Sequence, residues 1–181
     1  MIRFRRAKMN IAVISYSFSG NNDALAGSVA KELSSDYFQI SEAKPRTLSS
    51  ITMDMIFSRI PLVQPSPNLL MKYDLILFFG PIWMGQVATP IRPYLRHFKK
   101  NPNKYGFISI SGGADGPNTK VPGELRKRAG ADPVVFIDLY IADLISTNPK
   151  PTRKATSAYK LDPSDIKQLT CTIVKRLKDV T

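Results

Sequence analysis

Cysteine and histidine are almost absent from this chain. Its 181 residues include one cysteine, Cys171, and one histidine, His97. A single cysteine cannot support a disulfide framework or a thiol-rich metal site, and a single histidine removes most of the remaining metal chemistry. We therefore expect no metal site, and a reducing, cytoplasmic setting fits best.

Long apolar runs are also missing. No run approaches the roughly 20 residues that a membrane-spanning helix needs, so we expect no membrane span. The first 20 residues place a basic stretch before an apolar one, as signal peptides do, but serines break the apolar part and no small-residue cleavage site follows. We expect a basic extension at residues 1–8 followed by one domain at 9–181; translation starting at Met9 is the alternative.

Acidic residues are few, with 14 Asp and Glu against 26 Lys and Arg, for a net charge of +12. Positive charges cluster in "LRHFKK", "ELRKRAG" and "KPTRKATSAYK". Such a field attracts acidic partners and phosphorylated ligands, although the same clusters also fit ordinary solvated helix faces and loops. Because no basic motif interleaved with aromatic residues is present, we expect no nucleic-acid partner.

What the chain does contain is a regular alternation of short apolar runs with helix-period segments. The pattern predicts strands at 9–16, 37–41, 73–80, 104–111 and 133–140, and helices at 22–35, 48–60, 89–100, 118–130 and 162–180. Thr89 is the expected N-cap of the third helix, with Pro90 just inside it. This alternation indicates a parallel sheet with helices on both faces, which binds ligands at the carboxyl ends of its strands.

The loop after the first strand, in "YSFSGNNDALA", has the character of an anion site. It runs into a helix N-terminus, where unpaired N–H groups and the helix dipole attract negative charge, and Gly20 permits close approach of the backbone. Ser17, Ser19 and Asn22 add neutral donors, and no Lys or Arg lies in the loop, so a phosphate monoester fits without a neighbouring cation. The alternative is that Asn22 only caps the helix while the serines satisfy a turn.

Two further loops follow the third and fourth predicted strands and should meet the first. In "PIWMGQVA", Trp83 lies between Pro81 and Gly85, where its ring can stack on a flat ligand or pack into the core. In "SISGGADGPN", the backbone N–H groups of Gly112, Gly113 and Gly116 can reach the polar edge of such a ring.

Together, "SFSGNN", "PIWMGQVATPIRPYL" and "SGGADG" resemble the loops of flavodoxin-like FMN proteins over nearly the whole chain from Met9. Asn22 departs from the family's usual threonine, although its amide can still donate to phosphate. The resemblance implies a phosphate loop, a residue beside the isoalloxazine (Trp83) and a loop at the ring's pyrimidine edge. It assigns FMN contacts to Ser17, Phe18, Ser19, Gly20, Asn21, Asn22, Pro81, Ile82, Trp83, Met84, Gly85, Ser111, Gly112, Gly113 and Ala114.

The resemblance implies a three-layer α/β, flavodoxin-like fold with a five-stranded parallel sheet of order 2-1-3-4-5 and noncovalent FMN. It also implies electron transfer between a redox donor and acceptor, protein or small molecule, without a catalytic side chain. Electron-carrier flavodoxins usually are acidic and carry a tyrosine in the third loop, whereas this chain is basic and has none there. We lean toward a small reductase of quinones or similar acceptors over a one-electron carrier. A module that binds a phosphorylated ligand or a partner without redox turnover is the alternative.

Overall fold

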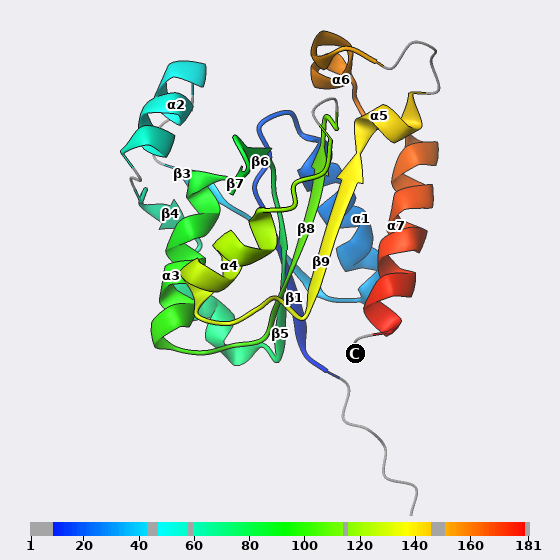
Figure 1. Ribbon diagram of the computed structural model, residues 1–181. Helices are drawn as coiled ribbons and strands as arrows, with labels where there is room; N and C mark the ends of the chain where they lie inside the picture. Colours follow the sequence, from blue (N-terminus) through cyan, green and yellow to red (C-terminus); the bar gives the residue numbers. More distant parts are fainter. Residues whose placement is uncertain (1–8, 43–46, 58–59, 114–115, 146–150, 180–181) are drawn as a thin grey trace, which may run out of the picture.

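A computed structural model describes residues 9–42, 47–57, 60–113, 116–145 and 151–179 (Figure 1). Its centre is a parallel sheet of five strands in the order β2-β1-β5-β8-β9. Numbered along the chain, this order is 2-1-3-4-5, so the predicted topology is confirmed. The strands are β1 (Ile11–Ser15), β2 (Asp36–Gln39), β5 (Leu75–Phe79), β8 (Tyr105–Ser111) and β9 (Val135–Tyr140).

Strand β5 has the sequence LILFF, and all five of its residues are buried because helices cover both faces of the sheet. Successive side chains of a strand point to opposite faces. Ile76 and Phe78 therefore belong to one hydrophobic cluster, and Leu75, Leu77 and Phe79 to the other.

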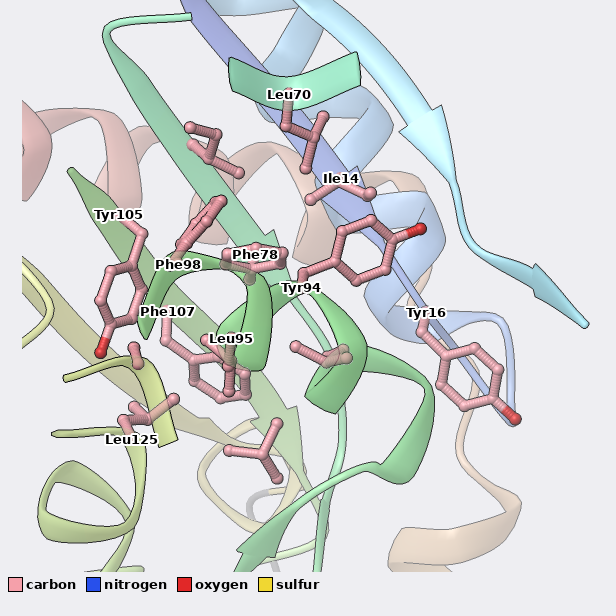
Figure 2. Close-up of a cluster of buried hydrophobic side chains, with 14 of the residues drawn as sticks. Ile14, Tyr16, Leu70, Phe78, Tyr94, Leu95, Phe98, Tyr105, Phe107 and Leu125 are labelled. Atoms are coloured by element: carbon pink, nitrogen blue, oxygen red, sulfur yellow. The ribbon is translucent and has the colours of Figure 1, made fainter. Parts of the chain in front are cut away.

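Two helices cover each face of the sheet, which confirms the three-layer architecture (Figure 1). On one face lie α1 (Asn21–Leu33) and α7 (Pro163–Lys178), and on the other lie α3 (Arg92–Lys100) and α4 (Val121–Ala129). Beneath α3, the ring of Phe78 lies 5.9 Å from that of Tyr94 and 5.8 Å from that of Phe98, centroid to centroid (Figure 2). Tilted aromatic contacts of this kind add to the energy of area burial and anchor α3 on the sheet.

Short elements complete the fold between the main strands and helices. The antiparallel pair β3 (Ser41–Glu42) and β4 (Val63–Gln64) flanks α2 (Leu48–Ile56) in sequence, and the 3₁₀ turn η1 (Pro67–Lys72) follows. Near the carboxyl ends of the strands lie the hairpin β6 (Ile82–Trp83) and β7 (Gln86–Val87), with α5 (Ile141–Leu144) and α6 (Arg153–Ala158) (Figure 1). The sequence pattern predicted the helix of α2 but not the hairpin, α5 or α6.

The start of the third predicted helix differs from the expectation. Thr89 is not the N-cap of α3 but the first residue of a 3₁₀ turn, η2 (Thr89–Ile91), whose own N-cap is Ala88. Proline fixes φ near −65°, which suits a tight first turn, and the turn buries Thr89 completely. The expected extension at residues 1–8 lies outside the described residues. Within the described parts of the chain, no helix has the length and apolar character needed to cross a membrane.

Candidate functional site

The loop between β1 and α1 turns on Gly20, which has φ of +94° and leaves open space where a Cβ would lie. The Ser17 hydroxyl folds back over the helix start and accepts from the N–H groups of Gly20 (2.9 Å) and Asn22 (3.2 Å). Within the described residues, the N–H groups of Ser19 and Asn21 have no hydrogen-bond partner. The loop thus combines the positive end of α1 with two donors still available to an anion.

Asn22 has a different partner from the phosphate expected of it. Its side chain is buried and pairs twice with the backbone of Ile110 in β8: Oδ1 accepts from the N–H (3.0 Å) and Nδ2 donates to the carbonyl oxygen (3.2 Å). A buried amide without partners costs about 1–3 kcal/mol, so this pairing fixes the loop to the sheet. Asn22 therefore fixes the position of the loop relative to β8.

Asn21 performs a similar task toward the end of the chain. Its Nδ2 donates to the carbonyl oxygen of Tyr159 (2.9 Å), and its Oδ1 accepts from the N–H of Leu161 (3.2 Å). These two bonds hold the segment between α6 and α7 against the loop. As a result, the Lys160 ammonium group donates to the carbonyl oxygen of Ser19.

The sequence did not predict that Lys160 contacts the first loop. The loop itself contains no cation, as predicted, but a lysine 141 positions away in the sequence contacts it. The cluster "KPTRKATSAYK" was noted only for its charge, and no spacing rule connects it to residues 17–22. The site therefore has a positive charge that a phosphate can approach.

The second loop is the hairpin β6–β7, in which Trp83 pairs with Gln86. Its two central residues have positive φ, +51° at Met84 and +72° at Gly85, as a two-residue hairpin turn requires. The half-buried Trp83 ring meets Tyr16 edge-on at 5.8 Å and packs at the border of the core. Trp83 also lines the crevice described below.

The third loop is packed closely against its neighbours. Gly113 has φ of +76°, and a Cβ there would lie 2.5 Å from the Cβ of Tyr140, so only glycine fits. The hydroxyl of Tyr140 donates to Asp138 Oδ2 (2.6 Å), which also accepts from Asn118 Nδ2 (2.9 Å). Burial, together with this bond to the Asp138 carboxylate, raises the pKa of Tyr140 to about 12.

The three loops enclose one crevice at the carboxyl ends of the strands, where doubly wound sheets bind ligands. It consists of two adjoining cavities of about 450 Å³ each, which share residues of the second loop, the third loop and α6. Predicted residues lining the first cavity are Phe18, Ser19, Asn21, Asn22, Pro81, Ile82, Trp83, Ser111 and Gly112, and the second adds Met84, Gly85 and Gly113. Volumes of this size are typical of small-molecule sites.

Not every predicted residue lines the crevice. Ser17 turns toward the helix start, as described, and Gly20 contributes its backbone conformation. Ala114 lies outside the described residues. Gly116, whose backbone was expected near the ligand, lines the second cavity. The crevice also contains residues that were not predicted, from β8, α5, α6 and the third loop: Ile110, Ile141, Arg153, Thr156, Ser157 and Asn118.

A carboxyl group lies beneath the first loop. Asp23, in the first turn of α1, accepts from the Ser15 hydroxyl at 2.6 Å. Burial raises the pKa of the Asp23 carboxyl, and the hydrogen bond from Ser15 partly opposes that shift. The positive end of α1 therefore lies next to a carboxyl group that ionises less readily than usual.

Solved structures share the fold of this chain. A flavoprotein from Lactobacillus acidophilus NCFM, determined in complex with FMN, matches with a TM-score of 0.58 and 23% identity over 72% of this chain and 93% of that one. A short-chain flavodoxin associated with a PDU bacterial microcompartment matches with a TM-score of 0.52 and 17% identity, over 96% of this chain and 100% of that one. The chain has a flavodoxin-like fold.

The flavodoxin-like fold is also shared with a protein from Klebsiella pneumoniae that is assigned as a quinone reductase. The TM-score is 0.52 and the identity 13%, over 94% of this chain and 84% of that one. No family model matches the sequence, and no curated protein matches it.

Proposed function

We propose that the chain binds FMN in this crevice and transfers electrons, acting as a small reductase of quinones or similar flat acceptors. The observation that carries the proposal is the meeting of three loops around one crevice, with an anion site at one end and Trp83 along its wall. The similarity to flavoproteins, one of them in complex with FMN, supports the choice of cofactor. A bound flavin would supply the redox chemistry, and the protein would supply binding, orientation and electrostatics.

The residues present fit a flavin phosphate. The free N–H groups of Ser19 and Asn21 and the dipole of α1 favour an anion at the first loop, and Gly20 leaves room for it. The Lys160 ammonium group adds a charge that the loop lacks. We assign the phosphate end of the ligand to this loop and the ring to the space between the second and third loops.

The shape of the crevice supports the proposal of a reductase. Beyond the cavity at the first loop, a second cavity of about 450 Å³ continues past Met84 and Gly85 to Asn118 and Arg153. Small glycines form much of its wall, and no aromatic side chain lines this second cavity within the described residues. A flat acceptor can therefore share the crevice with the cofactor, whereas a carrier would keep its ring covered.

The first test compares FMN with riboflavin, which lacks the phosphate, and with FAD, which carries an adenylate on it. Titrated by fluorescence quenching, FMN should bind at least ten-fold more tightly than riboflavin, and FAD should gain nothing from its adenine. Lys160→Gln should weaken FMN by about 1.4- to five-fold, the range of an exposed charge pair worth 0.2–1 kcal/mol, and leave riboflavin unchanged. Lys167→Gln, an equal change of charge on α7, is the matched control. Equal affinity for riboflavin and FMN would contradict the phosphate assignment.

The second test addresses turnover. FMN-loaded protein, reduced with dithionite under anaerobic conditions, should recover its oxidised flavin absorbance rapidly when benzoquinone is added. A protein that binds FMN but returns to the oxidised state no faster than free reduced FMN would favour the alternative of a ligand-binding or docking module.

A further inference from the structure

A separate cavity, which is not part of the crevice, lies between α3 and α4 on the opposite face of the sheet from α1 and α7. Its volume is about 630 Å³, within the range of small-molecule sites. The described residues that line it are Ile60, Gln86, Arg92, Arg96, Lys99, Glu124, Lys127 and Arg128. Nothing in the proposed chemistry of the crevice uses these side chains.

The two helices direct cations into this cavity. Arg92, Arg96 and Lys99 follow one another on α3 at intervals of four and three residues, which places them on one face of the helix. Lys127 and Arg128 face them from α4. Five cationic side chains therefore line the cavity, and they attract a ligand of high negative charge.

Glu124 is the only carboxylate among the described lining residues, and it is already engaged. One of its oxygens accepts from Arg128 Nε, and the other accepts from the backbone N–H of Val87 at 3.0 Å. Its single negative charge offsets only one of the five positive charges of the lining. The side chains that line the cavity therefore carry a strong excess of positive charge.

The cavity wall is held in place by a buried arginine. Arg92 is only 1% exposed, and its guanidinium group donates through Nε to the carbonyl oxygen of Val87 (3.2 Å) and through Nη2 to Gln86 Oε1 (3.1 Å). Arg128 Nη2 donates to the same Gln86 oxygen at 3.2 Å. These bonds fix Arg92 and Arg128 before any ligand arrives, which lowers the entropy cost of binding.

We propose that this cavity binds a compact anion with two or more adjacent phosphate groups, such as pyrophosphate or the diphosphate end of a nucleotide. Arginine forks match phosphate oxygens in bidentate pairs, and the exposed Arg96 can offer such a fork. Arg92 and Arg128, whose Nε and Nη2 donors are already engaged, contribute their charge. No aromatic side chain lines the cavity within the described residues, so the lining there offers no aromatic ring to a base. The recognition is therefore of phosphate and independent of whether a nucleoside is attached.

The test is calorimetric titration with sodium pyrophosphate at about 0.15 M salt, on protein saturated with FMN so that the crevice is closed to the probe. We expect one binding event, at least ten-fold tighter than that of inorganic phosphate. Arg96→Gln combined with Lys127→Gln removes two exposed cations and should weaken pyrophosphate at least ten-fold. Lys175→Gln combined with Lys178→Gln removes the same charge from exposed positions of α7, across the sheet, and should change the affinity less than two-fold.

Further ligands decide which source of phosphate is recognised. ADP binding within three-fold of pyrophosphate, with adenosine not binding, would support recognition of phosphate alone. Absence of pyrophosphate binding to the unaltered protein, or an equal loss in both double variants, would overturn the proposal. Adenosine binding as tightly as ADP would also overturn it. Because the Arg96 and Lys127 variant leaves the crevice intact, its FMN affinity should be unchanged, so a failure here is distinct from a failure of the FMN proposal.

Discussion

At the scale of a single residue, Trp83 contacts both the hydrophobic core and the crevice. Its ring meets Tyr16 at an angle of 86° and packs against the border of the core, while another part lines the crevice. Edge-to-face aromatic contacts contribute about 0.5–1.5 kcal/mol beyond area burial. A substitution at this position therefore affects both folding stability and ligand affinity, and the two effects have to be measured separately.

Trp83→Ala should weaken FMN by about 1–3 kcal/mol, the range measured when aromatic side chains that stack on bases are replaced by alanine. Trp83→Phe should lose less, because a smaller ring still offers a face. Fluorescence titration gives the affinities, and urea unfolding of the flavin-free proteins gives the stability of each variant. If Trp83→Ala only destabilised the protein and left the affinity of the folded fraction unchanged, the indole would serve packing alone.

Asp23 provides a pH-dependent prediction, since burial raises its carboxyl pKa above the ordinary value of 3.8. Because the pKa is raised in the folded state, Asp23 favours folding most below about pH 3.8, where it is protonated. This contribution to the free energy of unfolding is lost as the pH rises through the shifted pKa. Asp23→Asn keeps an oxygen that can accept from Ser15 and cannot ionise. Its free energy of unfolding, relative to the unaltered protein, should therefore increase between about pH 3 and pH 7.

The opposing effect at Asp23 is the helix dipole, which stabilises a negative charge in the first turn by about 0.3–1 kcal/mol. Urea unfolding at both pH values decides between the two. If Asp23→Asn became less stable than the unaltered protein as the pH rose, attraction to the N-terminus of α1 would outweigh burial.

At the scale of elements, the crevice depends on how α6 and the segment after it dock on α1. Asn21 makes both hydrogen bonds that hold Tyr159 and Leu161, and Thr156 is buried next to Gly112. A Cβ at Gly112 would lie 2.9 Å from Thr156 Oγ1, so the third loop and α6 already are in close contact. The wall of the crevice is therefore set by contacts between distant parts of the chain.

Asn21→Ala should loosen this wall. Loss of two hydrogen bonds leaves the carbonyl oxygen of Tyr159 and the N–H of Leu161 without these partners, and we expect faster amide hydrogen exchange over residues 153–161 with weaker FMN binding. Asn103→Ala is a matched control, because Asn103 Nδ2 donates to the carbonyl oxygen of Tyr73 at the opposite end of the sheet. Unchanged exchange over 153–161 in Asn21→Ala would show that other contacts hold the segment.

Much of the element order was predictable because it follows from local pattern. The apolar run of β5 and the helical spacing of Leu25, Val29 and Leu33 determined the layers, and the parallel order followed from strands alternating with helices. The loops of the site were predictable as well, since glycine, serine and tryptophan interrupt that pattern at strand ends. The β6–β7 hairpin was not predicted, because only two residues on each side form it.

The partners of the asparagines could not be predicted from the sequence. Asn21 and Asn22 are adjacent and chemically identical, yet one pairs with Tyr159 and Leu161 and the other with Ile110. Their choice depends on which backbone groups the tertiary fold leaves nearby, and local spacing carries no information about that. Lys160 was missed for the same reason.

At the scale of the whole molecule, the net charge of +12 creates a field that extends beyond any single site. Exposed charges are screened over about 8 Å at physiological ionic strength, so attraction between proteins weakens as salt is added. The basic cavity between α3 and α4 is one concentration of that charge. An acidic redox partner should therefore be steered toward this protein at low salt.

Stopped-flow measurement of electron transfer from an acidic ferredoxin to the FMN-loaded protein tests this expectation. The second-order rate should fall steeply between about 0.02 and 0.3 M salt, since steering acts mainly on the association rate. Oxidation of the reduced protein by benzoquinone, a neutral small acceptor, should show little dependence on salt and serves as the control. A protein partner with a salt-independent rate would reduce the charge to a contribution to solubility.

The docking of Lys160 on the first loop also affects the order of events during synthesis. The loop and the segment that completes it are 138 to 141 residues apart, and the N-terminal part of a chain leaves the ribosome first. At about 5–20 residues per second, on the order of ten seconds separate the translation of the two parts. A nascent chain that ends before residue 153 has the loop but neither the lysine nor the wall formed by α6. We therefore expect a phosphorylated cofactor to bind the chain more tightly once residues 153–161 have been translated than before.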